Sequence, residues 1–142
     1  MNRILNISIK ALCALLMVAS VGCSDDEDKD RTAPFGNVQT PVSGREFIRG
    51  QSIILNASFT DDRELSHVVV TVYALKGTRG IDTPWSATET IELKGKEQTL
   101  ASYELFGNVI PSDIMSGSYF LDFLIVDKAQ NNMKLVVPIV IE

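Results

Sequence analysis

IILNASFTDDRELSHVVVTVYA, at residues 53–74, carries the strongest secondary-structure pattern of the chain. Four apolar residues alternate with mostly polar ones in its first half: Ile53, Leu55, Ala57 and Phe59. A period of two with one apolar face is typical of a half-buried β-strand. Polar residues 61–64 then turn the chain. Alternating valines over 68–72 predict a second strand, because β-branched side chains favour a pleated sheet over a helix.

The same alternation recurs along the rest of the chain in short segments separated by turns. The further predicted strands are 35–42, which proline breaks into an edge strand, and 88–93, 98–105, 119–126 and 135–141. Residues 119–126 are apolar on much of both faces, which favours a central position in a sheet. Pro138 lacks a backbone N–H, so the last strand is predicted to lie at an edge. About seven short strands without helical periodicity predict an all-β fold, a Greek-key β-sandwich of two sheets.

Residues 1–22 have the features of a secretory signal peptide. Arg3 and Lys10 precede an uncharged run from Ala11 to Val21, and the small residue Gly22 follows this run. The run is shorter than the roughly 20 residues that a membrane-spanning helix requires. A retained transmembrane helix is the alternative interpretation.

The end of this segment, Ser20-Val21-Gly22-Cys23, resembles a bacterial lipobox. The resemblance implies attachment of diacylglycerol to the Cys23 thiol, cleavage before Cys23 and acylation of the new amine. Two or three acyl chains anchor a protein stably, whereas one chain alone holds it only marginally. The alternative is an ordinary signal peptide with an incidental cysteine.

Residues 23–33 are predicted to be the lipidated cysteine and an acidic, disordered tether. The seven residues after Cys23 are SDDEDKD. They resemble the acidic export tails that send some Gram-negative lipoproteins to the outside of the outer membrane. The predicted location is therefore the outer membrane, with the domain facing the cell exterior. The alternative for this segment is a plain solubilising spacer.

Loss of the signal peptide changes the charge and the cysteine content. It removes Arg3 and Lys10, which leaves 11 of the 13 basic residues against 18 acidic ones, a net charge of −7. A surface of this sign repels nucleic acid and anionic lipid. Cys13 leaves with the signal peptide and Cys23 carries the lipid, so no disulfide or thiolate metal site is expected in the folded part. Residues 34–142 suffice for one domain.

Four short motifs carry a resemblance to a known family. They are FTDDREL at 59–65, IP at 110–111, GSY at 117–119 and DKAQN at 127–131. Together they resemble the bacterial immunoglobulin-like pattern, and the chain is most similar to a family of uncharacterised surface lipoproteins with a single immunoglobulin-like domain. The resemblance implies an immunoglobulin-like sandwich over residues 34–142. Some relatives carry several histidines, whereas this chain has only His67 and has Phe120 after Tyr119, so no metal-handling role is implied.

Acidic and amide residues gather at two predicted turns. They are Asp61, Asp62 and Glu64 at one turn, and Asp127 and Asn131 at the other. In a Greek-key sandwich the two turns could converge, and hard oxygen ligands of this kind suit Ca²⁺. The alternative is turn chemistry, because Asp and Asn side chains accept hydrogen bonds from nearby backbone N–H groups.

Tyr73 and Trp85 are the candidates for contact with a ligand. They flank a predicted loop at 76–83, and exposed aromatic side chains on such loops stack on sugars or anchor a protein partner. The alternative for Trp85 is that it folds back over the core. The sequence has no Gly-x-Ser-x-Gly elbow and no glycine-rich phosphate loop, so neither catalysis nor a cofactor is expected.

These features predict a non-catalytic surface lipoprotein, bound to the membrane through Cys23, that is a binding or accessory module for a protein or glycan partner. It is not expected to bind nucleic acid. The alternatives from other classes are a structural subunit or spacer of a surface assembly and a small calcium-binding protein.

Overall fold

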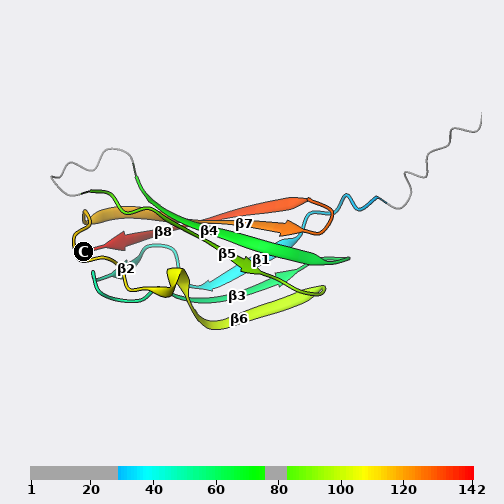
Figure 1. The fold of residues 1–142 in the computed structure, drawn as a ribbon, viewed down its shortest axis with the longest axis horizontal. Coiled ribbons are helices and arrows are strands. Elements are labelled where there is room, and N and C mark those ends of the chain that lie inside the picture. The colour runs from blue at the N-terminus through cyan, green and yellow to red at the C-terminus, as the bar shows by residue number, and fades with distance from the viewer. Residues whose placement is uncertain (1–28, 76–82) are drawn as a thin grey trace, which may run out of the picture.

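A computed structural model describes residues 29–75 and 83–142. The predicted signal peptide, Cys23 and most of the predicted loop at 76–83 lie outside the described residues. Two sheets face each other in the described part (Figure 1). One sheet has the strand order β1-β3-β6 and the other has the order β2-β8-β7-β4-β5.

The bounds of the strands follow the predicted segments closely. The three-stranded sheet consists of β1 (Phe35–Thr40), β3 (Ile54–Thr60) and β6 (Glu97–Glu104). The five-stranded sheet consists of β2 (Arg45–Phe47), β8 (Asn132–Ile141), β7 (Gly117–Asp127), β4 (Leu65–Ala74) and β5 (Ala87–Glu92). One 3-10 turn, η1 (Leu105–Gly107), follows β6. Neighbouring strands are antiparallel except β2 and β8, which are parallel.

This strand order is that of an immunoglobulin-like sandwich, which confirms the predicted fold class. The broken first segment contributes two strands instead of one. β1 belongs to the three-stranded sheet, and after Pro41 the chain crosses to the other sheet, where β2 joins β8. The chain changes sheet again between β2 and β3, between β3 and β4, between β5 and β6, and between β6 and β7. These crossings enclose one core between the two sheets.

The core is formed by the inward faces that the alternation predicted. Completely buried side chains include Leu55, Ala57 and Phe59 of β3, Val68, Val70 and Val72 of β4, and Leu121, Phe123 and Ile125 of β7. Burial of one large aliphatic or aromatic side chain stabilises a fold by about 1.5–3 kcal/mol. β7 pairs with β4 on one side and with β8 on the other, so its predicted central position is confirmed.

The predicted edge position of the last strand is wrong. β8 lies between β2 and β7 and pairs with both. Pro138 is opposite Phe120 on β7, and its carbonyl accepts a hydrogen bond of 2.7 Å from the Gly44 N–H. The backbone N and C=O of one residue point to the same side of a strand, so the missing donor of Pro138 faces away from β7. An interior strand tolerates this proline because β2 begins to pair only at Arg45.

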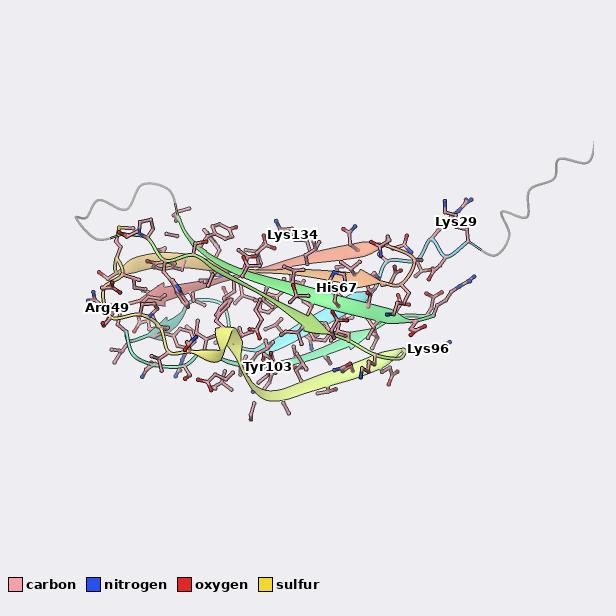
Figure 2. All side chains as sticks on the ribbon, in the orientation of Figure 1. Lys29, Arg49, His67, Lys96, Tyr103 and Lys134 are labelled. Carbon is pink, nitrogen blue, oxygen red and sulfur yellow. The ribbon has the colours of Figure 1, made fainter. Side chains whose placement is uncertain are left out.

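The two ends of the sandwich carry different segments. The described chain starts at Lys29 at one end, with the β3–β4 turn, the β5–β6 turn and the β7–β8 hairpin; we call this the tether end (Figure 1). Lys96 lies at the same end as Lys29, whereas Arg49 lies at the opposite end (Figure 2). The Asp61 N–H donates to the Lys96 carbonyl over 2.8 Å, which joins two of the turns. The opposite end, called the groove end, contains β2 and the C-terminal end of β8 (Figure 1).

Candidate functional site

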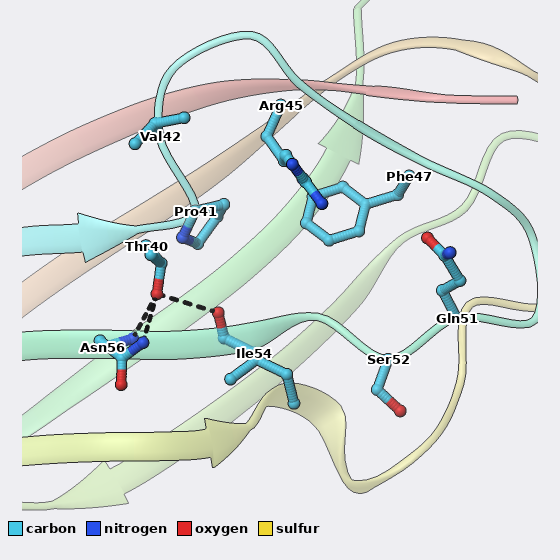
Figure 3. A pocket seen from close by; sticks show the side chains of 9 residues that line it. All are labelled: Thr40, Pro41, Val42, Arg45, Phe47, Gln51, Ser52, Ile54 and Asn56. Atoms are coloured by element: carbon cyan, nitrogen blue, oxygen red, sulfur yellow. Dashed lines mark hydrogen bonds between the residues drawn. The ribbon is translucent and has the colours of Figure 1, made fainter.

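A groove opens at the groove end, between β2 and the residues that lead into β3. It is lined by Thr40, Pro41, Val42, Arg45, Phe47, Gln51, Ser52, Ile54 and Asn56. Its volume is about 750 Å³, within the range of roughly 300–1,000 Å³ of small-ligand pockets. Figure 3 shows the segment from Thr40 to Phe47 along one side of the opening and β3 along the other.

The groove exists because β1 stops before β3 does. β1 ends at Thr40, opposite Asn56, and Pro41 then starts the crossing to the other sheet. β3 and the residues before it extend further than Asn56, to Ile54 and beyond. In the described part of the chain no strand covers this side of residues 52–54. The edge of the three-stranded sheet is therefore open inside the groove.

Backbone groups on this edge point away from β6. The Ile53 carbonyl accepts a hydrogen bond of 2.9 Å from the Leu105 N–H, on the β6 side. The Gln51 carbonyl likewise accepts from the Ile110 N–H. Ile54, the first residue of β3, and by alternation Ser52 before it therefore direct their N–H and C=O groups to the open side. The Thr40 hydroxyl is 3.5 Å from the Ile54 carbonyl, where β1 ends. Further along the groove, the backbone meets no described strand.

Most polar side chains of the groove are already hydrogen-bonded within the protein. Thr40 Oγ1 accepts a hydrogen bond of 2.7 Å from the side-chain amide of Asn56. Asn56 Oδ1 in turn accepts one of 2.7 Å from the Ser102 N–H. The Ser52 hydroxyl donates to the Glu104 carboxylate. These side chains shape the groove, and the Ser52 oxygen, which has only donated, can still accept a hydrogen bond.

The free N–H donors in the groove come from Gln51 and Arg45. Gln51 Oε1 accepts a hydrogen bond of 3.0 Å from the Ile48 N–H, which leaves its NH₂ group toward the groove without a partner among the described residues. The Arg45 guanidinium has no hydrogen bond or ion pair within residues 29–75 and 83–142. Arg45 is also the only charged residue that lines the groove in this part of the chain. The groove therefore offers a positive charge with no carboxylate among its own lining residues, while Glu46 and Glu142 line a second hollow that Arg45 also borders.

The walls of the groove are largely apolar. Val42 is 59% exposed and Ile54 is 40% exposed, while Phe47 and Pro41 are buried beneath them. Apolar walls beside a free guanidinium suit a ligand that combines an apolar body with an anionic group. Among the described lining residues there is no histidine or carboxylate, so the groove contains no candidate general base.

The structure places Trp85 against the core. Its half-buried ring packs on core residues and meets Phe106 edge-on, with ring centroids 5.5 Å apart. The backbone N–H of Trp85 donates a hydrogen bond of 3.3 Å to the Tyr119 hydroxyl oxygen. The Tyr119 hydroxyl donates to the Met115 carbonyl over 2.6 Å, which is the tyrosine corner of immunoglobulin-like sandwiches. This arrangement corresponds to the alternative in which Trp85 folds over the core.

Tyr73 lies on the outer face of the five-stranded sheet. It is 37% exposed, and its ring centroid is 5.6 Å from that of Phe120 on β7. An ion pair of 2.6 Å between Lys134 and Asp122 joins the neighbouring strands and raises the pKa of Lys134. Among the described residues no ring contact joins Tyr73 and Trp85, so the structure does not bring the two predicted contact residues together.

At the tether end, Asp61 and Asp62 lie beside Asp30. One carboxylate oxygen from each of the three residues is within 4.8 Å of the others. Asp61 Oδ1 accepts hydrogen bonds from the N–H groups of Arg63 (2.9 Å) and Glu64 (2.7 Å), as turn chemistry predicts. Its Oδ2 atom is buried without a hydrogen-bond partner among the described residues. The Glu64 side chain does not join the cluster, and the calcium site stays a prediction.

Asp127 and Asn131 hold the β7–β8 hairpin. Asp127 is fully buried, and its two oxygens accept hydrogen bonds from the Asn131 N–H (2.8 Å) and from the Asn131 side-chain amide (2.7 Å). The same amide donates to the Asp30 carbonyl over 3.3 Å, which links the hairpin to the start of the described chain. Gln130 turns the hairpin with a φ of 72°, a region that costs a residue other than glycine roughly 1–2 kcal/mol.

Two groups of functional interest were not singled out from the sequence. The first group is Arg45 with the open edge beside β3 in the groove. The sequence feature that could have indicated it is Pro41, which breaks the first strand. Across the sandwich, Glu89 accepts hydrogen bonds of 2.5 Å from the Tyr103 hydroxyl and from the Phe106 N–H. The bond to the Glu89 carboxylate raises the pKa of Tyr103 to about 12. Neither group follows a local sequence motif.

The fold and the groove define the chain as an immunoglobulin-like module with a groove at one end. The family model described as "Domain of unknown function (DUF4625)" matches residues 21–142, so the chain belongs to this family. No curated protein matches the chain. Within residues 29–75 and 83–142, no helix has the length and apolar character needed to cross a membrane.

Two solved structures are similar to the chain at low identity. A fibronectin(III)-like module of CbhA from Clostridium thermocellum shares 17% identity with a TM-score of 0.44, over 75% of this chain and 94% of that one. A β-glucosidase from Listeria innocua in complex with glucose shares 18% identity with a TM-score of 0.38, over 75% of this chain and 16% of the glucosidase. Both TM-scores are below 0.5.

Proposed function

We propose that this chain is a lipid-anchored, non-catalytic binding module that presents its groove end to a protein or glycan partner outside the cell. The observation that carries the proposal is that Lys29 (Figure 2) and β2, whose residues line the groove (Figure 1), lie at opposite ends of the sandwich. A module anchored just before Lys29 would hold the groove on the side that faces away from the membrane.

The anchor in this proposal is Cys23. Residues 24–28 alone separate Cys23 from Lys29, so lipid on this thiol would keep the tether end near the bilayer. Two or three acyl chains give a stable attachment. The acidic run after Cys23 supports a position on the outer membrane that faces the cell exterior, because it resembles known export tails.

A binding role agrees better with the groove than a catalytic one. The groove combines apolar walls with free donors and has no candidate general base among its described residues. The family is one of unknown function and assigns no activity. The site is therefore suited to holding a ligand and not to transforming it.

The alternative of a structural subunit that assembles by strand addition has less support. The long last strand, β8, is paired on both sides and is not available to another chain. β1, β5 and β6 are edge strands of six to eight residues and remain open to pairing, so assembly through one of these edges stays the alternative to the binding role.

The anchor is tested with Cys23→Ala in cells supplied with labelled fatty acid. The wild-type chain is expected to take up label and to sediment with the outer membrane. Cys23→Ala is expected to lose both properties, because no thiol remains after the signal peptide is removed. Label and membrane fractionation are measured on the same samples.

Cys13→Ala is the matched control, because Cys13 lies inside the predicted signal peptide. This variant should be labelled like the wild type. Protease added to whole cells should digest the wild-type domain if it faces the exterior. Labelling of Cys23→Ala, or protection of the wild-type domain from protease, would contradict the proposal.

A further inference from the structure

The open edge formed by the start of β3 and the two residues before it has the length of a short added strand. Residues 52–54 span about 10 Å at roughly 3.3 Å per residue, enough for the last three residues of an extended peptide. Ser52 and Ile54 direct their backbone groups to this side, where β1 has already ended. A peptide here would occupy the position that β1 leaves vacant in the three-stranded sheet. Strand addition of this kind supplies main-chain hydrogen bonds that do not depend on sequence.

The side chains that line the groove determine which kind of peptide side chain would fit there. Along an extended peptide, side chains alternate between the two faces, so one of them would project between Val42 and Ile54. Both residues are exposed and apolar, with buried Phe47 beneath. An apolar side chain is favoured at this place because it removes these surfaces from water.

The positive charge of the groove indicates which end of a peptide would bind there. The Arg45 guanidinium is without a partner among the described residues, and no carboxylate lines the groove there. A guanidinium binds a carboxylate with two parallel hydrogen bonds. Arg45 and Phe47 are two residues apart on β2, so their side chains lie on the same face of this strand, next to the apolar wall.

A glycan fits the same groove less well. Sugar hydroxyls need acceptors as well as donors, and the hydroxyl and amide side chains of Thr40, Ser52 and Asn56 are engaged inside the protein. The free side-chain donors are the cation of Arg45 and the NH₂ group of Gln51, and the Ser52 oxygen is left as an acceptor. The positive charge of Arg45 favours an anionic ligand over a neutral sugar.

We propose that the groove binds the extended C-terminus of a partner polypeptide that ends in an apolar residue. The peptide main chain pairs with the open edge at Ser52 and Ile54, its last apolar side chain lies between Val42 and Ile54, and its terminal carboxylate binds Arg45. This inference rests on the proposed binding function and names the chemical class of its ligand.

The test uses an array of hexapeptides whose last three positions vary over all twenty amino acids. Each peptide is made with a free C-terminal carboxylate and with a C-terminal amide. The full chain is extracted in detergent from whole cells and applied to the array, and affinities of the best peptides are measured in solution. We expect binders that end in apolar residues, and a loss of about tenfold or more on amidation.

Arg45→Gln is expected to weaken the carboxylate peptide about tenfold, and amidation should then have no further effect. Val42→Asp should weaken it as well, because a carboxylate would face the bound anion. Arg31→Gln removes the same charge at the tether end and should bind like the wild type. Peptide binding should also slow hydrogen exchange of the Ile54 amide, which a mere ionic contact would not do.

The inference is wrong if no peptide binds in a carboxylate-dependent way, or if Arg45→Gln and Arg31→Gln behave alike. It is equally wrong if laurate displaces the peptide with the same affinity without protection of the Ile54 amide, since the groove would then bind anionic amphiphiles. Fatty-acid labelling of Arg45→Gln is measured in parallel. Normal labelling with lost peptide specificity would separate a failure of this inference from a failure of the membrane anchor.

Discussion

The tether end and the groove end both collect polar residues, but folding leaves different groups free at each. At the tether end, Asp127 has both oxygens bonded to Asn131, and Asp61 Oδ1 caps two backbone N–H groups. At the groove end, the acceptors of Thr40 and Asn56 are engaged and the Arg45 guanidinium is not.

The difference shows that residue type alone does not identify a binding group. Aspartates are common metal ligands, yet both oxygens of Asp127 and one oxygen of Asp61 accept hydrogen bonds that stabilise the turns in which they lie. Arg45 belongs to no motif and is nevertheless the lining residue with a free charge. The groups that remain unpaired after folding decide where a ligand can bind.

The largest effect on stability is expected from Asp127→Ala, which removes the hydrogen bonds that hold the β7–β8 hairpin at the tether end. The substitution removes two hydrogen bonds to a buried carboxylate and should lower the free energy of unfolding by about 3 kcal/mol. Urea unfolding measures the change. Lys128→Ala, at an exposed neighbour, should change it by less than about 0.5 kcal/mol. A loss below about 1 kcal/mol for Asp127→Ala would show that the hairpin does not depend on this carboxylate.

A smaller effect is expected from Tyr119→Phe, which tests how the β6–β7 connection is held. The buried Met115 carbonyl would lose its donor, and the Trp85 N–H would lose its acceptor. We expect the free energy of unfolding to fall by about 2 kcal/mol, measured by urea unfolding. Tyr73→Phe is the matched control, because the Tyr73 hydroxyl has no hydrogen bond among the described residues. Equal effects of the two substitutions would contradict a stabilising role of the tyrosine corner.

The smallest effect concerns the region between the two ends, where β6 leads into η1. The hydrogen bond to Glu89 raises the pKa of Tyr103 from 10.0 to about 12. This contribution is fully present below pH 10 and is lost as the pH rises from 10 to 12, because the unfolded chain loses the phenolic proton first. Solvent screens this partly exposed pair, so the loss at pH 11 should stay below about 1 kcal/mol.

Wild-type protein and Tyr103→Phe are compared by urea unfolding at pH 9, 10 and 11. The difference in stability between them should shrink as the pH rises, while the contributions of other titrating groups cancel. A difference that stays constant from pH 9 to pH 11 would show that the Tyr103 proton is not held by Glu89.

Most strands could be predicted from the sequence, because alternation is a local property. The valines of β4 and the apolar residues of β3 each show one buried face without reference to the rest of the chain. The turn at 61–64 was predictable for the same reason, since an Asp side chain caps the backbone N–H groups that follow it. The position of β8 was not, because Pro138 indicates a missing donor but not which neighbour it faces.

The candidate site was less accessible to sequence reasoning. Tyr73 and Trp85 flank one loop, yet the structure puts Tyr73 on an outer sheet face and Trp85 against the core. Arg45 and Ile54 are on strands of different sheets, and only the early end of β1 brings them to one groove. No periodicity in the sequence reports such an ending.

The sequence by itself determined the strands and the turn residues, and it predicts the Cys23 anchor, since each depends on neighbouring residues in the chain. The tertiary structure alone decided the pairing of β8 with β2, the meeting of Asp30 with Asp61, and the free guanidinium beside the open edge of β3. The physical reason is that these features depend on which distant segments pack together, and on which hydrogen-bonding groups that packing leaves without a partner.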